Sequence, residues 1–413
     1  DATTAPFFSP LVEKNRLSRL VDFENRDAIF PAVHRSYKFC LLTLGRDEAV
    51  ARFAFFLTDL AQLADPERIF TLTPEAIGRL SPNTKTAPVF RSRADAYLTE
   101  KIYEHSDIFI RMNGRNEFSS FLLIIILNFF SGSNRADSEI FEKYLNCGPA
   151  GNLLPVLRGG DISIFDHRFG IDSEIKSAEK EWYGDGRFAP KKEITRRLSS
   201  KGWNKEWLIG WRDIARSSDE RTVIAAAFPV CATDDTLSLL LPCVGKCELA
   251  GALLGNLNSL TLDYAAQSKV GGTHIRKNVI AQFPILPPSF YTEPRLSFVV
   301  PKVLELTYTS HSLAPFARDL GYDGPPFRWD EDRRAMLRAD LDAFYARAYG
   351  LDRDELRYIL DPADVKGPDY PSETFRVLKE KETRQFGEYR TRRLVLAAWD
   401  RMEADGTFKT MEL

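Results

Sequence analysis

Cysteine is scarce in this sequence of 413 residues, and the cysteines present are poorly placed for pairing. Their number is odd and their positions are scattered: Cys40, Cys147, Cys231, Cys243 and Cys247. This usage is typical of a reducing compartment and argues against a disulfide framework, so we expect a cytoplasmic protein. Cys243 and Cys247 lie close together, but no second Cys or His pair follows at the spacing of a zinc site. We therefore expect no metal.

The sequence also lacks an excess of charge of either sign, with 56 Lys and Arg residues against 58 Asp and Glu residues. Any surface for nucleic acid must therefore be local. The longest apolar run, at 121–130, is too short to span a bilayer, and DATTAPFFSP lacks the basic start and long apolar core of a signal peptide. We expect no membrane contact. Because no Met stands at the start, we expect the chain to be part of a longer protein.

The hydrophobic share of 44% is enough for large cores, and the length predicts two or three domains. Residues 21–44 predict two strands around a turn at Pro31. The second strand, at 37–44, alternates so little that we expect it to be buried on both faces. Residues 47–61 predict a helix capped by Asp47, and 81–104 predict a turn-rich stretch followed by a helix.

Further along, 223–230 and 236–242 predict short strands, and the leucine spacing in 247–267 predicts a helix. Past a proline-rich segment at 283–294 the pattern becomes helical, at 333–350, 352–362 and 371–403. For the last of these we expect Ser372 as N-cap and either one long helix or two abutting helices divided at Gly387.

Two local features favour nucleic-acid binding. Residues 187–216 hold nine Lys or Arg residues against three acids, together with Trp203, Trp207 and Trp211. The basic residues fit either a phosphate-tracking surface or a solvated loop, and for the tryptophans we favour a core role. The segment 269–276, KVGGTHIR, places basic side chains around two glycines, whose backbone a partner can approach closely. An ordinary helix–helix turn is the alternative.

Several segments then point in one direction when they are taken together and in order: FENRDAIFPAVHRSYKFCLLTLG, PNTKTAPVFRSRADAYLTEKIY, FDHRF, WRDIARSSDERTVIAAAFP, LLGNLNSLTLDYAAQSKVGGTHIRKNVIAQFPILPP, LRYILDP and SETFRVLKEKETRQFGEYRTRRLVLAAWD. They resemble the adenine-specific DNA methyltransferases of type II-G restriction–modification systems, in which methylase and specificity share one chain. The resemblance covers most of residues 20–400. Residues 253–288 also resemble the closing element of a target-recognition domain in type I specificity subunits.

The resemblance implies a mixed α/β fold in three parts. Residues 1–65 would be the last strands and a helix of a Rossmann-like methyltransferase sheet, 66–290 a target-recognition domain, and 291–413 an all-helical C-terminal domain. The implied function is sequence-specific recognition of double-stranded DNA for methylation of the N6 of a flipped adenine. The expected DNA contacts are Lys269, Gly271, Gly272, Thr273, His274, Arg276, Arg212, Arg216 and Arg168.

The catalytic motifs of that family are missing from this sequence. The nearest match to Asn/Asp-Pro-Pro-Tyr/Phe is at 323–327, where Gly324 stands in place of the required polar side chain. CGPAGN at 147–152 is the nearest glycine-rich turn, but no strand leads into it. We therefore expect both motifs upstream of residue 1, so that the parent enzyme uses S-adenosylmethionine and this chain alone binds no cofactor. The methylase would lie upstream in cis or be a separate protein.

Two alternative functions and the role of one segment stay open. One is a stand-alone specificity subunit that docks on a separate methylase. Another is a non-catalytic scaffold, which the unexpectedly apolar segment within 107–141 suggests; we assign no site there. In FDHRF, adjacent side chains of a strand would point to opposite faces, which disfavours catalysis and leaves a DNA contact or a buried polar anchor.

Overall fold

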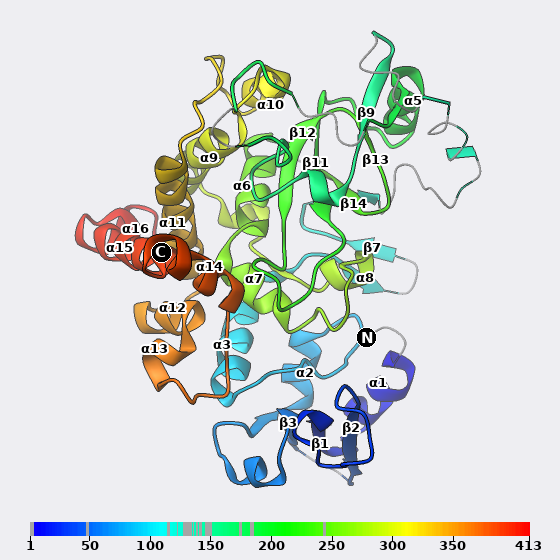
Figure 1. The fold of residues 1–413 in the computed structure, drawn as a ribbon, viewed down its shortest axis with the longest axis vertical. Coiled ribbons are helices and arrows are strands. Elements are labelled where there is room, and N and C mark those ends of the chain that lie inside the picture. Colours follow the sequence, from blue (N-terminus) through cyan, green and yellow to red (C-terminus); the bar gives the residue numbers. More distant parts are fainter. Residues whose placement is uncertain are drawn as a thin grey trace.

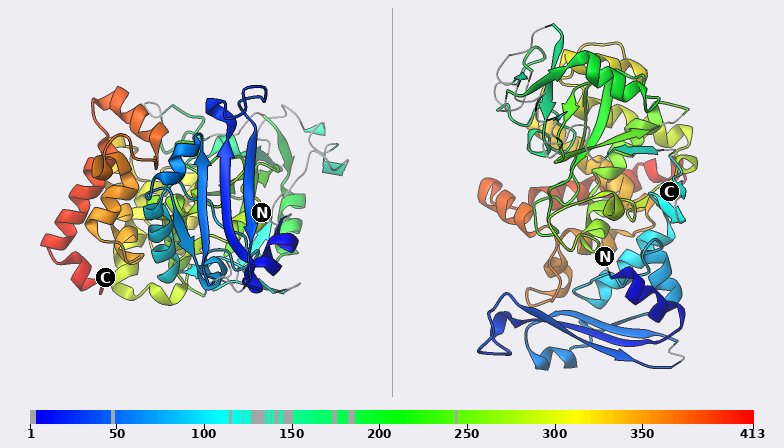
Figure 2. Two further views of the ribbon diagram at one scale, coloured as in Figure 1. Left: turned by 90° about the horizontal axis from the view of Figure 1, so that it is seen from below. Right: turned by 90° about the vertical axis from the view of Figure 1, so that its right-hand side faces the viewer.

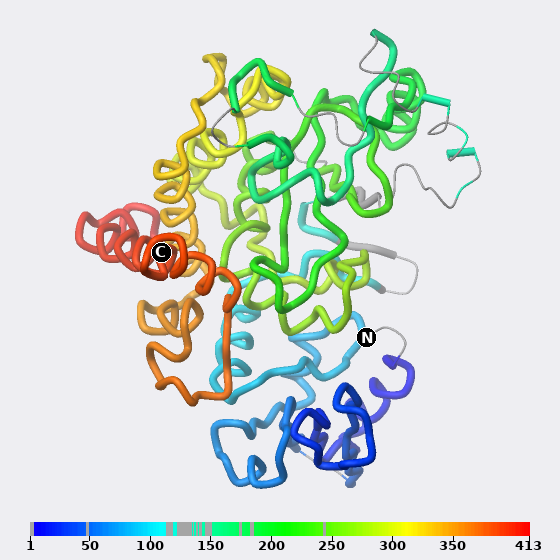
Figure 3. The backbone as a smooth tube through the Cα atoms, viewed as in Figure 1, coloured from blue at the N-terminus to red at the C-terminus, as the bar shows by residue number. Residues whose placement is uncertain are grey.

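The computed structural model describes residues 4–46, 49–113, 116–121, 123–126, 134, 136–137, 139, 143–144, 151–172, 176–181, 186–242 and 245–413, with side chains left out at 113, 116–118 and 123–126. The fold is mixed α/β with a helical C-terminal region, as the sequence predicts. Figure 1 and the backbone tube of Figure 3 place a sheet of N-terminal strands at one end of the molecule. The helices beyond residue 330 lie along one side of the molecule.

The N-terminal sheet follows helix α1 (Ala5–Glu13) and has the order β2-β1-β3-β4. Its strands are β1 (Leu17–Glu24), β2 (Lys38–Leu44), β3 (Ala51–Leu57) and β4 (Phe70–Leu72). Strand β1 pairs antiparallel with β2 and parallel with β3. The right-hand view of Figure 2 shows this sheet as a layer below the rest of the chain.

The helix expected at 47–61 is wrong, because its middle forms strand β3 and only Leu60–Ala64 turns as a short 3-10 helix. The strand is buried on both faces: Ala51, Phe53 and Phe55 pack in the main core cluster, and Ala54 and Leu57 pack in a second one. The rings of Phe53 and Phe55 stack on Phe70 of β4. Pairing with neighbouring strands, strengthened by these aromatic pairs, outweighs the helical propensity of the segment.

The expected burial of the second strand is also wrong. The strand itself is present as β2, but it forms an edge of the sheet, and most of its side chains are exposed on both faces. Leu41 is 55% exposed and Leu44 is 47% exposed. In this strand the apolar run is therefore not a sign of burial on both faces, and Phe39, which stacks on Phe23 of β1, is its one partly buried residue.

The middle of the chain contains helices α2 (Pro74–Leu80), α3 (Arg93–Glu104) and α5 (Lys191–Ser199) and a set of small sheets. The strands are β5 (Asp107–Ile108), β6 (Arg111–Asn113), β7 (Asn116–Phe118), β8 (Leu123–Ile126), β9 (Leu153–Leu157), β10 (Phe188–Pro190), β11 (Trp207–Arg212), β12 (Ala225–Pro229), β13 (Ala232–Thr233) and β14 (Leu237–Pro242). The largest sheet here has the order β12-β11-β14-β8. The predictions for 223–230 and 236–242 are thus confirmed as β12 and β14.

The tryptophans of the basic stretch fill the core, as favoured from the sequence. Trp203, Trp207 and Trp211 are all buried, and each indole N–H donates to a protein acceptor. Trp207 and Trp203 meet edge to face at 5.1 Å. These rings stabilise the β11 layer and are not available to stack on a partner.

The helical segment predicted at 247–267 is divided into α6 (Glu248–Leu257) and α7 (Leu260–Gln267). Short elements α8 (Lys277–Ile280) and β15 (Pro284–Ile285) follow, and β15 pairs with β5. The remaining helices are α9 (Glu293–Thr307), α10 (Ala314–Asp319), α11 (Glu331–Ala348), α12 (Arg353–Leu360), α13 (Pro362–Lys366), α14 (Arg376–Phe386), α15 (Arg390–Ala404) and α16 (Thr407–Thr410).

The predicted division at Gly387 is confirmed: this residue ends α14 with φ of 76°, a conformation that glycine adopts without strain. Ser372 is not the N-cap, because α14 begins only after Phe375. The hydroxyl of Ser372 instead donates to the buried carboxylate of Asp95 at 2.9 Å.

One core cluster contains residues from α1 through α16, and it includes the apolar residues of the proline-rich segment. Phe283, Ile285 and Leu286 are completely buried there. Asp95 on α3 joins distant parts of this core by accepting from the hydroxyls of Tyr264 and Tyr358. In the part of the chain that the structure describes, no helix is both long and apolar enough to cross a membrane.

Candidate nucleic-acid interface

The basic glycine segment forms an exposed loop between α7 and α8. Val270 is buried and anchors the start of the loop, and Ile275 is buried at its end. Between them, residues 271–274 are exposed. Nothing lies within 4 Å of the position that a Cβ would take on Gly271 or Gly272. The backbone of this loop is therefore open to the approach of a partner.

This loop pairs with the loop that follows β11. The amide of Ala215 donates to the carbonyl of Thr273 at 3.1 Å, and the amide of Ile275 donates to the carbonyl of Asp213 at 2.7 Å. We call residues 213–219 and 271–276 together the paired loops. They bring Arg216, Thr273, His274 and Arg276 onto one surface, although the two loops lie far apart in the sequence.

The carboxylate of Asp213 holds the paired loops together electrostatically. Its Oδ2 lies 2.5 Å from Nδ1 of His274 and 3.4 Å from Nε of Arg276. Asp213 is completely buried, whereas the His274 side chain is 46% exposed. The carboxylate thus orients two nitrogen-bearing side chains whose other atoms face solvent. Nothing in the sequence links position 213 with position 274, so sequence analysis missed this residue.

Arg168 does not belong to this surface, and its expected DNA contact is wrong. The residue is completely buried, and its guanidinium donates to the carbonyls of Ser177 at 2.6 Å, Lys180, and Thr309 at 2.8 Å. Burial lowers the pKa of Arg168. A guanidinium without exposed surface cannot reach a phosphate, so Arg168 is the buried polar anchor that was the alternative interpretation.

The neighbouring residues of FDHRF are also internal. The segment is a tight turn and not a strand, with φ of 56° at Phe165 and a bridge between Ser163 and Asp166. Asp166 and His167 are buried, and burial lowers the pKa of His167 to about 3. His167 is therefore neutral at pH 7 and is a buried side chain of the core.

Arg212 and Lys269 direct their charges inward, so the structure does not support them as DNA contacts. Arg212 donates from Nε to the carbonyl of Gly159 at 2.9 Å and from Nη2 to that of Ile162 at 2.6 Å. The ammonium group of Lys269 donates to the carbonyl of Leu80 at 2.6 Å. Burial lowers the pKa of Lys269 to about 7.

The basic stretch at 187–216 does not form one surface. Its first half lies on α5, which Figure 1 shows at a different place from α8 and the elements beside it. On α5, Arg196 and Arg197 bind Glu193 and hold the pKa of that carboxyl at about 2. Lys191 and Lys192 are exposed there. Of the predicted DNA contacts, those in the paired loops are therefore the ones that lie together on an exposed surface. Arg216 is the residue of the basic stretch that belongs to this surface.

The described residues contain no cluster of His, Cys, Asp or Glu that could hold a metal ion. Most of the glycine-rich turn at 147–152 and many residues of 107–141 lie outside the described residues, as does Cys243. At 323–327, Phe327 stacks on Tyr322 with ring centroids 5.0 Å apart, and Tyr322 occupies the space beside Gly324. This turn is thus a packed part of the fold.

No protein-family model matches the sequence, and no curated protein matches it. Among solved structures, the chain is similar to the type IIG restriction endonuclease BpuSI, with 12% sequence identity and a TM-score of 0.29. The similarity covers 85% of this chain and 46% of the BpuSI chain, so this chain spans less than half of the length of BpuSI.

Proposed function

We propose that this chain is the DNA-recognition part of a site-specific DNA N6-adenine methyltransferase of a restriction–modification system. The proposal unites the motif resemblance with the geometry of the paired loops. In it, Arg216 and Arg276 bind phosphates, while Thr273 and His274 approach base edges in the major groove of double-stranded DNA. The exposed glycines let the backbone come close to the duplex.

The single observation that carries the proposal is the pairing of residues 213–219 with 271–276. Two loops that the sequence singles out separately meet through backbone hydrogen bonds, and both are exposed. A rigid, two-loop surface with arginines at its edge is suited to fix a duplex in register, because phosphate contacts position the protein and polar side chains specify bases. The buried carboxylate of Asp213 supplies the rigidity.

The exposed edge of the N-terminal sheet is an argument that this chain has a protein partner. Strand β2 offers unpaired backbone groups and apolar side chains on both faces, which is the surface that another strand or domain would cover. We propose that the methylase part covers it, either as an upstream domain in cis or as a separate protein. In this proposal S-adenosylmethionine and the catalytic motif both belong to that part.

Fluorescence-polarisation titration of a random DNA duplex across a salt series tests the proposal. We expect binding that weakens steeply with salt, because each neutralised phosphate contributes a slope of about −0.9 in log affinity against log salt. Arg216→Ala and Arg276→Ala should each lower that slope by about one unit. Arg384→Ala, on the exposed side of α14, is the matched control and should leave the slope unchanged.

Two results would count against the paired loops. If Lys191→Ala and Lys192→Ala weaken binding while the variants at Arg216 and Arg276 do not, the DNA contacts α5. If a folded chain ignores duplex DNA at low salt, the assay is repeated with the methylase supplied. Absence of binding there as well would leave the scaffold alternative.

A further inference from the structure

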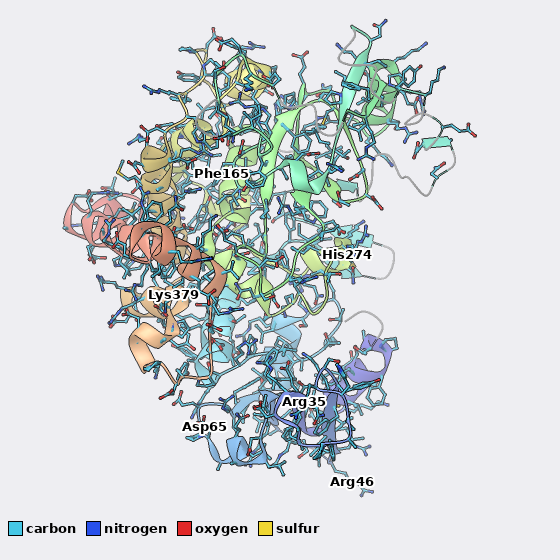
Figure 4. The ribbon with its side chains drawn as sticks, viewed as in Figure 1. Arg35, Arg46, Asp65, Phe165, His274 and Lys379 are labelled. Atoms are coloured by element: carbon cyan, nitrogen blue, oxygen red, sulfur yellow. The ribbon has the colours of Figure 1, made fainter. Side chains whose placement is uncertain are left out.

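A groove of about 820 Å³ lies between the β-rich middle and the C-terminal helices, and one side of the loop at 213–219 lines part of it. One wall is built from residues within 163–172, from Lys176, and from residues within 212–224. The other wall consists of one face each of α11, α14 and α15, whose lining residues recur at helical spacing. In Figure 4, Lys379 marks α14 on this side, and His274 of the paired loops lies toward the other side of the view. The volume is within the range of small-molecule sites.

Arg338 on α11 contributes a charge to this groove that no described residue neutralises by contact. It lines the groove and is only partly exposed, and among the described residues it has neither a hydrogen bond nor an ion pair, so that neighbouring charges act on it only from a distance. The other groove cations differ, because Lys176 binds Asp166 at 2.7 Å and Lys381 binds Glu220 at 2.9 Å. Arg338 is thus free to bind an anion.

The carboxylates near Arg338 are already engaged by other donors. Asp342 accepts from the amide of Leu260 at 2.8 Å, and Glu331 accepts from the indole of Trp329 at 2.8 Å. Glu382 accepts from the amide and the hydroxyl of Thr391 at 2.7 and 2.6 Å. These acids attract Arg338 from a distance, and each of them already accepts at least one hydrogen bond from another group.

Aromatic rings stand on both walls of the groove. Phe169, in the turn after the FDHRF segment, is 53% exposed, and Phe386, at the end of α14, is 43% exposed. The guanidinium of Arg390 lies over the ring of Phe386 at 4.9 Å, and Lys176 and Arg334 lie over the ring of Trp329 at 3.8 and 3.7 Å. Phe169 is thus the aromatic ring for a ligand to stack on, and an exposed ring in one groove with an unpaired guanidinium suits a flat aromatic group joined to an anion.

We propose that this groove binds a nucleotide, with its phosphate on Arg338 and its base against Phe169. The nucleotide has two sources with the same chemistry: a free nucleoside phosphate, or one unit of a single strand of nucleic acid. The groove shares residues such as Ile214 and Asp219 with the paired loops, but none of the four side chains assigned to DNA lines it, namely Arg216, Thr273, His274 and Arg276. The Glu220–Lys381 ion pair joins its two walls at one point.

The two sources are separated by two probes on the full chain: a fluorescent derivative of ATP and a fluorescein-labelled oligo-dT. We expect one of them to bind with a dissociation constant below about 1 mM. Arg338→Ala should weaken that binding about tenfold or more, because a charge-assisted hydrogen bond to phosphate is lost. Arg338→Lys should restore part of it, and Arg384→Ala is the control that removes the same charge from α14 outside the groove.

Phe169→Ala is the second variant, and its exposed position keeps the test valid if a change at Arg338 impairs folding, which circular dichroism would reveal. Duplex binding should be unchanged in Arg338→Ala, so a failure here is distinct from a failure of the proposed function. The proposal is overturned if neither probe binds at about 1 mM. It is equally overturned if Arg384→Ala weakens binding as much as Arg338→Ala does.

Discussion

The imidazole of His274 lies 2.5 Å from the carboxylate of Asp213, although 61 positions separate the two residues in the sequence. The acid is completely buried, and the His274 side chain is 46% exposed. A buried carboxylate is stabilised when positively charged or N–H groups bind it, and here both such groups come from the loop after α7. The relationship turns two exposed loops into one surface with a fixed shape.

Asp213→Asn separates positioning from net charge. The substitution keeps the shape of the side chain but removes the charge that holds Arg276. We expect weaker duplex binding and faster amide hydrogen exchange at Ala215 and Ile275, whose hydrogen bonds join the loops. If only net charge mattered, the substitution would strengthen duplex binding, because it removes a negative charge from a surface that faces phosphates. Stronger binding with unchanged exchange would therefore refute the positioning role.

Lys269 makes stability depend on pH above neutrality. Its folded pKa is about 7, while its unfolded pKa is near the ordinary value of 10.5. Between these values the unfolded chain binds a proton that the folded chain does not, so the free energy of unfolding rises with pH. One such group contributes a slope of up to about 1.4 kcal/mol per pH unit.

Urea unfolding of the native chain and of Lys269→Met measures this effect. Below pH 7 the folded chain carries the cost of a buried charge, which Met relieves, and toward pH 10 this advantage of Met should disappear. The difference in unfolding free energy between the two proteins should therefore shift in favour of lysine as pH rises. A difference that stays constant from pH 6 to pH 10 would show that Lys269 titrates normally.

Asp95→Ala should destabilise the chain strongly, because one carboxylate satisfies hydroxyls from three segments. Its Oδ1 accepts from Tyr264 and Tyr358 at 3.0 Å each and from Ser372 at 2.9 Å. Loss of the acceptor leaves buried donors unpaired, and we expect a cost of about 3 kcal/mol or more in chemical denaturation. Tyr358→Phe is the matched control, which removes one donor and should cost about 1 kcal/mol. Equal costs would mean that the network is not shared.

The sequence predicts elements whose pattern is local, such as β12, β14, α11 and the glycine stop of α14. It fails where the outcome depends on neighbours. Strand β3 has residues spaced for either a helix or a strand, and its pairing with β1 decides between them. Strand β2 has the composition of a buried strand, yet its place at the edge of the sheet leaves it exposed.

The same limit applies to the candidate site. The exposed glycine loop and the loop with Arg216 both carry local signals, namely glycine, charge and polar composition. Their pairing depends on the tertiary structure. The burial of Arg168 does so too, because its acceptors include Thr309, which is distant in the sequence. A sequence of charges does not show which guanidinium faces solvent, because burial is set by segments that meet only in the fold.

Strand β2 should make the chain self-associate when nothing covers it. Its unpaired edge and exposed apolar side chains form a template for a second strand, and a lysine on such an edge opposes pairing. We therefore expect light scattering to show a mass that rises with protein concentration, and we expect Leu41→Lys to reduce that rise. Leu60→Lys is the matched control, because Leu60 is 62% exposed but lies in the 3-10 helix after β3. If both substitutions act equally, general surface hydrophobicity causes the association and the edge has no special role.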